Sequence, residues 1–260
     1  MRSTLTLVLL AILLTSNSLA GAQTMPRIIM MNLVNPELKI IPLDEARSSV
    51  PAVNGIPPQP PGSFILKNVS DRGITAVVVQ WSYIQKDGTT IKRGINCDGY
   101  AGTTTWVVVK PLALSLITPD GCTGHESFSR LTSGQATINK PIPLSEQIAR
   151  IELTLDSVIY EDGQIWGPDH LHYYKKIWER YSACQSVVNE IVAAKNAGEE
   201  IGPHLTRIRD EARASRDKQS AWKEHYAGLI ERSPNREGTI QQLQTQNPPP
   251  EFRHIGGEKQ

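Results

Sequence analysis

The sequence has almost no net charge. Its 260 residues carry 27 Lys or Arg against 26 Asp or Glu, and no run of five like charges occurs. A neutral chain exerts no long-range attraction on nucleic acid or on acidic lipid, so we expect neither partner. Beyond residue 22 the sequence also lacks an apolar run of roughly 20 residues, the length that a bilayer-spanning helix needs. We therefore expect no membrane span after that point.

Sequence patterns of the common catalytic sites are also missing. The chain has no Gly-x-Ser-x-Gly, no His-Glu-x-x-His and no phosphate-binding loop. Ser215 and Lys218 match a Ser-x-x-Lys pattern, but the Ser-Asp-Asn and Lys-Thr-Gly sequences that accompany it do not occur. His170 and His172 lie at the start of an expected helix, where residues two apart point in different directions and cannot bind one metal ion. We predict no catalytic residue, no cofactor and no metal site.

Cysteine is scarce. The three residues, Cys97, Cys122 and Cys184, allow at most one internal disulfide. Cys97 and Cys122 each adjoin an Asp-Gly turn signal in the strand-rich part of the chain, whereas Cys184 falls on the apolar stripe of a predicted helix. We predict a disulfide between Cys97 and Cys122 and a buried free thiol at Cys184.

The N-terminus has the order of a secretory signal peptide. Met1-Arg2 gives a positive start, Leu5 to Leu14 is almost wholly apolar, and Ala20-Gly21-Ala22 supplies small residues before the cleavage point. We predict a signal peptide at residues 1–22, with cleavage after Ala20 as the alternative. An uncleaved membrane anchor is the other interpretation, but the apolar core has only about half the length of a spanning helix. The mature chain is expected to be periplasmic or secreted.

Residues 23–167 predict an antiparallel β-sandwich. Turn signals such as Lys86-Asp87-Gly88 separate the apolar stretches and no helical pattern does, which disfavours a parallel sheet. Trp81, within the longest apolar strand, is expected in the core. The short, regularly spaced strands favour an immunoglobulin-like sandwich, with an eight-stranded barrel as the alternative. Strands are expected at 38–43, 63–68, 74–84, 89–97, 106–109, 112–118, 148–160 and 164–166.

Proline dominates the stretch from Asn54 to Gly62, which contains four prolines. Proline denies backbone donors and favours an extended path, so the stretch is expected to be a stiff connector between sheets. A proline motif for a partner is the alternative.

The hydrophobic period changes after Trp166. Apolar residues then recur every three or four positions, which predicts a long helix over about 169–196, with Asp169 as its cap. A second helix follows from Gly202-Pro203, so residues 168–233 predict a helical hairpin and the whole chain an α+β fold. Trp166 and Trp178 are expected to fasten the hairpin to the sandwich or to line a recognition surface. Residues 234–260 predict a short helix and a disordered tail.

Two stretches resemble known sequences. Leu155 to Gly163 with Gly167-Pro168-Asp169 is similar to a segment of uncharacterised exported bacterial proteins, in which a β-sandwich passes into a helical tail. Phe64 to Ser70 resembles the second strand of many bacterial immunoglobulin-like domains. Together the resemblance loosely covers residue 38 to about 232. It implies the architecture and a bacterial origin, and it implies no activity.

These observations favour an exported envelope protein that is a non-catalytic binding or scaffold module. Its partner, an envelope protein, would contact the helical hairpin, and the candidate surface comprises Trp178, Trp222, Tyr226 and Leu229. One alternative is a hydrolase of envelope polymers with dispersed acid–base groups. The groups would be Asp120, His125 and Glu126. The other alternative is an exported chaperone or assembly factor that complements a client at an edge strand.

Overall fold

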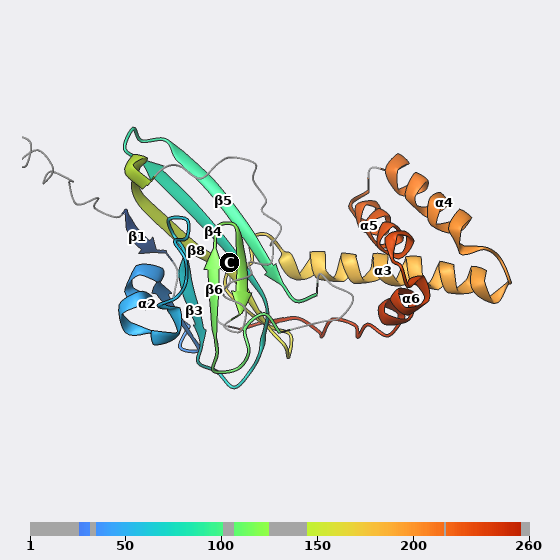
Figure 1. The fold of residues 1–260 in the computed structure, drawn as a ribbon, viewed down its shortest axis with the longest axis horizontal. Helices are drawn as coiled ribbons and strands as arrows, with labels where there is room; N and C mark the ends of the chain where they lie inside the picture. Colours follow the sequence, from blue (N-terminus) through green and yellow to red (C-terminus); the bar gives the residue numbers. More distant parts are fainter. Residues whose placement is uncertain (1–25, 32–34, 101–106, 125–144, 216, 256–260) are drawn as a thin grey trace, which may run out of the picture.

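The computed structural model describes residues 26–31, 35–100, 107–124, 145–215 and 217–255. The fold is mixed α+β, with two antiparallel-rich sheets followed by helices in the C-terminal half. The molecule is elongated, because one long helix, α3 (Tyr173–Asn196), extends from the sheets to a separate group of helices (Figure 1). The predicted α+β class is thus confirmed at this level.

Sheet A contains the longest strands and lies next to α3. Its order is β10-β9-β8-β4-β5, with β1 also pairing with β8. Neighbours are antiparallel except β1 with β8 and β10 with β9, which are parallel. The strands are β1 (Arg27–Met30), β4 (Ile74–Gln85), β5 (Thr90–Asp98), β8 (Ile148–Tyr160), β9 (Gln164–Trp166) and β10 (Arg253–His254).

Sheet B is shorter and antiparallel, in the order β2-β3-β6-β7. Its strands are β2 (Leu38–Pro42), β3 (Phe64–Asn68), β6 (Leu114–Thr118) and β7 (Gly121–Gly124). Its outer face is covered by α2 (Leu43–Ser49) and the short helix η1 (Pro51–Val53), which bury Ile65 and Leu116. The strand predicted at 106–109 is reduced to a bridge between Ile74 and Val109, and Trp106 lies outside the described residues.

The main core lies between the two sheets. Alternation along β4 points Val79, Trp81 and Tyr83 into this core and points Ala76 and Val78 to the outer face, against α3. Trp81 is fully buried, as predicted, and its indole N–H donates to the carbonyl of Gly62 at 2.9 Å. The hydrogen bond joins the core to the end of the proline-rich stretch.

The proline-rich stretch is a connector, but it does not cross between sheets as predicted. It completes the connection from β2 to β3, which are neighbouring strands of sheet B. It leads from η1 to β3, and the carbonyl of Pro61 accepts a hydrogen bond from the hydroxyl of Tyr83 at 3.0 Å. Its use as a motif for a partner stays a prediction.

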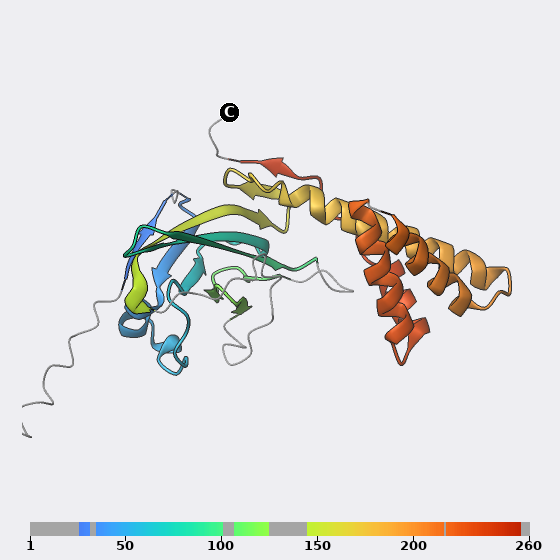
Figure 2. The same ribbon diagram turned by 90° about the horizontal axis from the view of Figure 1, so that it is seen from above.

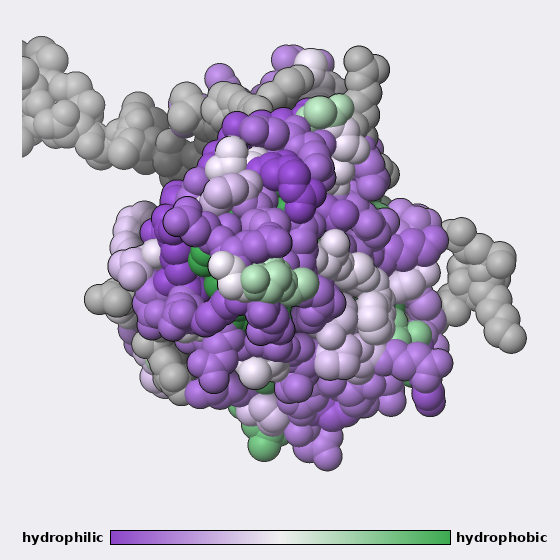
Figure 3. Space-filling model, turned by 90° about the vertical axis from the view of Figure 1, so that its right-hand side faces the viewer, coloured by the Kyte–Doolittle hydropathy of each residue, from purple (hydrophilic) through white to green (hydrophobic). Residues whose placement is uncertain are grey.

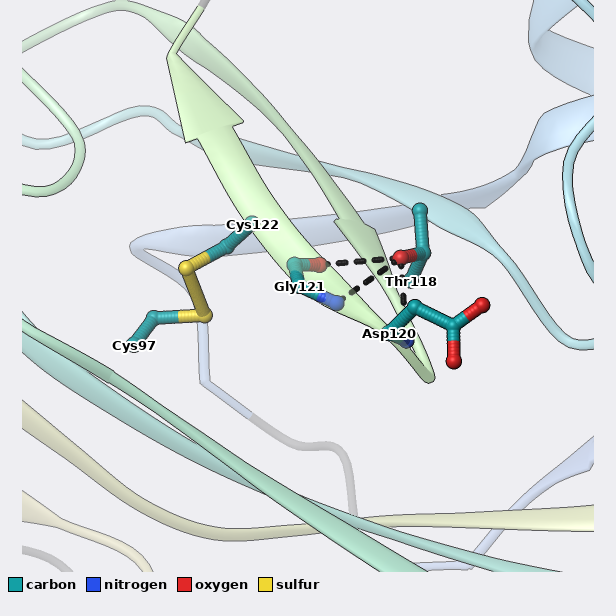
Figure 4. The surroundings of a disulfide bond; sticks show 5 residues. All are labelled: Cys97, Thr118, Asp120, Gly121 and Cys122. Atoms are coloured by element: carbon teal, nitrogen blue, oxygen red, sulfur yellow. Dashed lines mark hydrogen bonds between the residues drawn. A yellow bond between two sulfur atoms is a disulfide. The ribbon is translucent and has the colours of Figure 1, made fainter. Parts of the chain in front are cut away.

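Cys97 and Cys122 form a disulfide, as predicted, with their Cα atoms 6.0 Å apart. Cys97 lies on β5 of sheet A and Cys122 on β7 of sheet B, so the bond joins the two sheets. Figure 4 shows the bond beside the β6–β7 turn, where the Thr118 hydroxyl bonds to the backbone of Gly121 at 3.0 Å. Cys184 is free and buried, also as predicted.

The helices beyond α3 fold back against its distal half. They are α4 (Ile201–Ala214), α5 (Lys218–Arg232) and α6 (Arg236–Gln244). We call α3 to α6 the helical module, and it has its own hydrophobic core. The single second helix of the predicted hairpin is in fact two, because the polar stretch around Ser215 breaks it and Asp217 caps α5 by accepting from the N–H of Gln219. No helix in the described ranges is long and apolar enough to cross a membrane.

Residues 246–255 return to the sandwich, and we call them the C-terminal strap. The N–H of Arg253 donates to the carbonyl of Gly163 at 3.0 Å, and β10 lies beside β9 at the edge of sheet A (Figure 2). Gly163 has φ +83°, and a Cβ there would overlap the carbonyl of Glu251. Phe252 and Ile255 each pack against a hydrophobic core that includes residues of the sheets. The strap is therefore ordered up to Ile255, in contrast to the disordered tail predicted from the sequence.

Candidate functional site

The junction between sheet A and α3 begins with a β-bulge. Val78 pairs with Ser157 and Val79 with Leu155, so Asp156 of β8 is an extra residue without a partner on β4. A bulge re-aims the extra side chain relative to its strand. The Asp156 side chain is fully buried and lies at the turn that leads into α3.

Asp156 holds this turn through both its side chain and its backbone. The carboxylate accepts from the N–H groups of His170 and Leu171 at 3.0 and 3.2 Å, and the carbonyl accepts from the N–H of Asp169 at 2.8 Å. Gly167 has φ +107°, and a Cβ on it would lie 2.6 Å from the Asp156 carbonyl oxygen. The turn therefore requires glycine at this position.

Asp169 is not the N-cap of α3 as predicted, because the helix begins at Tyr173 and His172 occupies the N-cap position. Its Oδ1 accepts from the N–H of Tyr173 at 2.9 Å, which satisfies one of the free donors of the first turn. Its Oδ2 is buried without a hydrogen-bond partner among the described residues, and His254 Nε2 lies 4.0 Å away. Burial, with a smaller contribution from Asp156, raises the pKa of Asp169.

A buried ion pair fastens α3 to the end of β5. Arg180 Nη1 lies 2.7 Å from Asp98 Oδ2, which also accepts from the Tyr173 hydroxyl at 2.6 Å. Burial lowers the pKa of the Arg180 guanidinium, but the Asp98 carboxylate more than offsets this, so the pKa lies above its ordinary value. Burial also raises the pKa of Tyr173, so its hydroxyl stays a donor. Asp98 directly follows Cys97, and the disulfide and the ion pair therefore share the end of β5.

Arg180 also connects the sandwich to the helical module. Its guanidinium lies 5.2 Å from the centre of the Trp222 ring on α5, within the range of a cation–π contact. The second nitrogen, Nη2, is buried without a hydrogen-bond partner among the described residues, as is Oε1 of Gln246 on the strap. The side chain thus contacts both parts of the molecule and keeps unused donor capacity.

A narrow crevice opens beside Arg180. Its empty space, counted out to its open side, is about 190 Å³, and it is too narrow to enclose a water-sized sphere. This crevice, among the described residues, is therefore too small to enclose a small-molecule ligand. The walls come from α3, α5, the residue two positions after β5, and the strap. The lining residues are Tyr100, Ile177, Arg180, Tyr181, Tyr226, Gln246, Asn247 and Pro249.

The four predicted surface residues do not form one surface. Trp178 is 38% exposed, and Trp222 and Leu229 are partly buried against the module core. Tyr226 is only 1% exposed and belongs to that core, so its placement on a partner surface is wrong. The apolar stripe that contains Tyr226 faces the interior of the helical module, where α4 and α5 pack against α3. Seen from its end, the module is mostly hydrophilic, with small separate hydrophobic patches (Figure 3).

The residues considered for catalysis are not brought together in the described part of the chain. Asp120 pairs with Arg93 in an exposed ion pair, whereas His125 and Glu126 lie outside the described residues. Ser215 follows the end of α4 and Lys218 begins α5, so they are not one turn apart on a single helix. No group of three His, Cys, Asp or Glu side chains within the described ranges could hold a metal ion.

Sequence reasoning missed the roles of Asp98, Asp156 and Arg180. Arg180 had a usable signal, since it shares a helical face with the apolar positions Ile177 and Cys184, and a charge there indicates a buried partner. Asp98 and Asp156 had no comparable signal, because their partners lie far away in the sequence. Comparisons with protein-family models, with curated proteins and with solved structures found no match to this chain.

Proposed function

We propose that this chain is an exported protein of the bacterial envelope and acts as a non-catalytic binding or scaffold module. The charge, apolar core and small residues of positions 1–22 support export. A disulfide between Cys97 and Cys122 is compatible with an oxidising compartment. The resemblance of the Leu155–Asp169 region to exported bacterial proteins agrees with both points.

The proposed binding role rests on one observation: the helical module is held in a fixed position relative to the sheets. The module has its own core, and two chain segments connect it to the sandwich: α3 going out and the strap returning. The buried pair of Asp98 and Arg180 adds a third fastening. A buried ion pair contributes little net stability, and its best-supported use is to specify one arrangement of parts. Such an arrangement suits a protein that holds a recognition surface at a set angle.

The proposal is tested with the full chain rather than with a truncation at Trp166. Removing everything after Trp166 would also remove Phe252 and Ile255 from the sandwich cores, and the fragment could fail for that reason alone. A photoreactive benzoylphenylalanine is placed instead at Trp178, which is exposed on α3. The matched control carries it at Leu112, which is exposed on the sandwich.

We expect irradiation in native envelope extract to give a discrete crosslinked species at Trp178 and none at Leu112. The same species at both positions, or none at either, would count against a binding role for the module. Near-ultraviolet circular dichroism of each variant checks that the fold is retained.

Export has a separate test. Intact mass and N-terminal sequencing of the exported protein should find Gln23 as the first residue, or Gly21 if cleavage follows Ala20. A mature protein that still begins with Met1 would contradict a cleaved signal peptide.

We also propose that the sandwich is a variant of the immunoglobulin-like class. Two antiparallel-rich sheets over a common core, a disulfide between them and the buried Trp81 support this assignment. The parallel edge pairings of β1 and β10 are additions to that pattern.

A further inference from the structure

The C-terminal strap lies against a row of aromatic side chains on α3. Tyr174 packs edge-on against Phe252, with ring centres 6.0 Å apart, and Tyr181 lines the crevice together with the strap. Trp178 lies between them on the same helical face and packs edge-on against Tyr181 at 5.8 Å. We call Tyr174, Trp178 and Tyr181 the aromatic row. Trp178 remains 38% exposed, so the row continues into solvent.

The strap has the chemistry of a proline-rich ligand. It contains Pro248-Pro249-Pro250, and a residue before proline is steered away from the helical region, which favours an extended path for Asn247 to Pro249. Only Pro249 of the three prolines is buried, and it lines the crevice. Aromatic-lined grooves bind such segments because a polyproline helix is preformed and loses little entropy on docking. The strap is therefore an intramolecular occupant of the aromatic row.

The strap leaves polar groups of this site unpaired. The crevice remains beside Pro249, and Arg180 Nη2 and Gln246 Oε1 stay buried without partners among the described residues. Arg180 is 96% buried, and although its Nη1 is paired with Asp98, a buried N–H donor such as Nη2 that lacks an acceptor is unfavourable. Proline-rich chains offer carbonyl acceptors and few N–H donors, which matches a site made of rings and a free guanidinium donor. A ligand that places a carbonyl oxygen near Arg180 would accept a hydrogen bond from Nη2, which the strap leaves without a partner.

We propose that the aromatic row and Arg180 form a recognition site for a proline-rich, extended polypeptide segment of a partner. The segment binds by displacing residues 247–252 of the strap from α3. The inference rests on the proposed binding role and names the chemistry of its partner. The end of the strap is held by the two exposed residues of β10, Arg253 and His254, and by the partly buried Phe252 and Ile255. None of these side chains is fully buried, so we expect a partner segment to displace the strap.

The test uses a fluorescein-labelled peptide with the sequence of residues 245–254, Thr-Gln-Asn-Pro-Pro-Pro-Glu-Phe-Arg-His. Its binding to the full mature chain is followed by fluorescence anisotropy. Phe252→Ala loosens the strap in the protein, and a tenfold rise in the open fraction gives roughly tenfold tighter peptide binding. Pro249→Ser is a second loosening variant that leaves the hydrophobic cores intact. A peptide with its three prolines replaced by alanine should bind roughly tenfold more weakly.

Trp178→Ala in the Phe252→Ala background should abolish peptide binding. Leu171→Ala is the matched control, because Leu171 is similarly exposed and lies outside the aromatic row, and it should leave binding unchanged. Equal binding of the peptide to the unaltered chain and both loosened variants would overturn the inference, as would binding insensitive to Trp178→Ala. A strap-exchanged dimer of the Phe252→Ala variant that the peptide dissociates would assign the site to a second copy and overturn the partner assignment.

The outcome is distinguishable from failure of the proposed function. A crosslink at Trp178 together with no peptide binding would retain the binding role and remove the proline-rich partner. Peptide binding that requires Trp178, without any crosslink in envelope extract, would retain the site and remove the envelope partner.

Discussion

Arg180 Nη1 on α3 lies 2.7 Å from Asp98 Oδ2 at the end of β5, and both side chains are about 95% buried. The pair joins two elements that are far apart in the sequence and belong to different parts of the fold. Taking two charges out of water offsets most of their attraction, so the pair is not a strong source of net stability. Each charge is nevertheless needed once the other is present.

Replacing one member of this pair should therefore be strongly destabilising. Arg180→Leu leaves the Asp98 carboxylate buried without its cation, and we expect the free energy of unfolding to fall by about 3 to 5 kcal/mol. Urea denaturation followed by circular dichroism measures the loss. Arg213→Leu is the matched control, because its pair with Glu224 is exposed and screened by solvent, so its loss should change stability little.

The double variant Arg180→Leu with Asp98→Asn distinguishes two costs: losing the attraction between the two side chains, and leaving one buried charge without its partner. Its loss should be smaller than the sum of the two single losses, with a coupling of about 0.5 to 3 kcal/mol. Additive losses would mean that the two side chains do not act as a pair.

The strands could be predicted because each carries its own local signal. The strand predicted at 148–160 has the bounds of β8, and Lys86-Asp87-Gly88 predicted the turn between β4 and β5. The strap could not be predicted in this way. Its prolines indicate disorder when they are considered alone, and its order depends on Gly163 and on cores formed far earlier in the chain.

The candidate site was even less accessible from sequence. The disulfide could be predicted from turn signals beside Cys97 and Cys122, but the role of Asp98 depends on a contact with α3 that no local pattern encodes. Tyr226 shows the opposite problem. Its helical stripe is real, but periodicity cannot distinguish a face that packs on its own module from a face that waits for a partner.

Removing the disulfide should destabilise the sandwich. The bond spans a sequence separation of 25, and closing a ring of that size contributes roughly 3.5 kcal/mol in the loop-entropy model. We expect the variant Cys97→Ser with Cys122→Ser to lose about that much free energy of unfolding. Reductant should lower the stability of the unaltered chain by the same amount and leave the variant unchanged. If fully reduced protein unfolds at the same urea concentration as oxidised protein, the bond contributes nothing.

Asp169 should make stability depend on pH in a specific direction. Burial raises its pKa in the folded chain, so the native state binds the proton more tightly than the unfolded state does. Its contribution to the free energy of unfolding must then increase as the pH falls from neutral through the raised pKa. Asp169→Asn keeps an oxygen for the Tyr173 N–H and removes the charge.

The comparison is made by urea denaturation at several pH values between 7 and 4. The stability of Asp169→Asn relative to the unaltered chain should be highest at pH 7 and should decline toward pH 4. Other carboxylates titrate in both proteins and cancel in the difference. A difference that stays constant over this range would show that Asp169 titrates alike in the folded and unfolded chains.

Cys184 should report how the helical module opens. Burial raises the pKa of its thiol to about 12, and the thiolate is the reactive form, so alkylation of the native chain near pH 8 should be slow. Labelling must then pass through opening of the module core. Leu243→Ala removes a fully buried side chain from that core and should speed labelling by roughly 30-fold or more, for a loss of at least about 2 kcal/mol. Leu66→Ala makes the equivalent change in the sandwich core. If Leu66→Ala leaves the labelling rate unchanged, the helical module opens as a unit of its own. If both changes accelerate labelling equally, the chain opens as a single cooperative unit, joined through Arg180 and the strap.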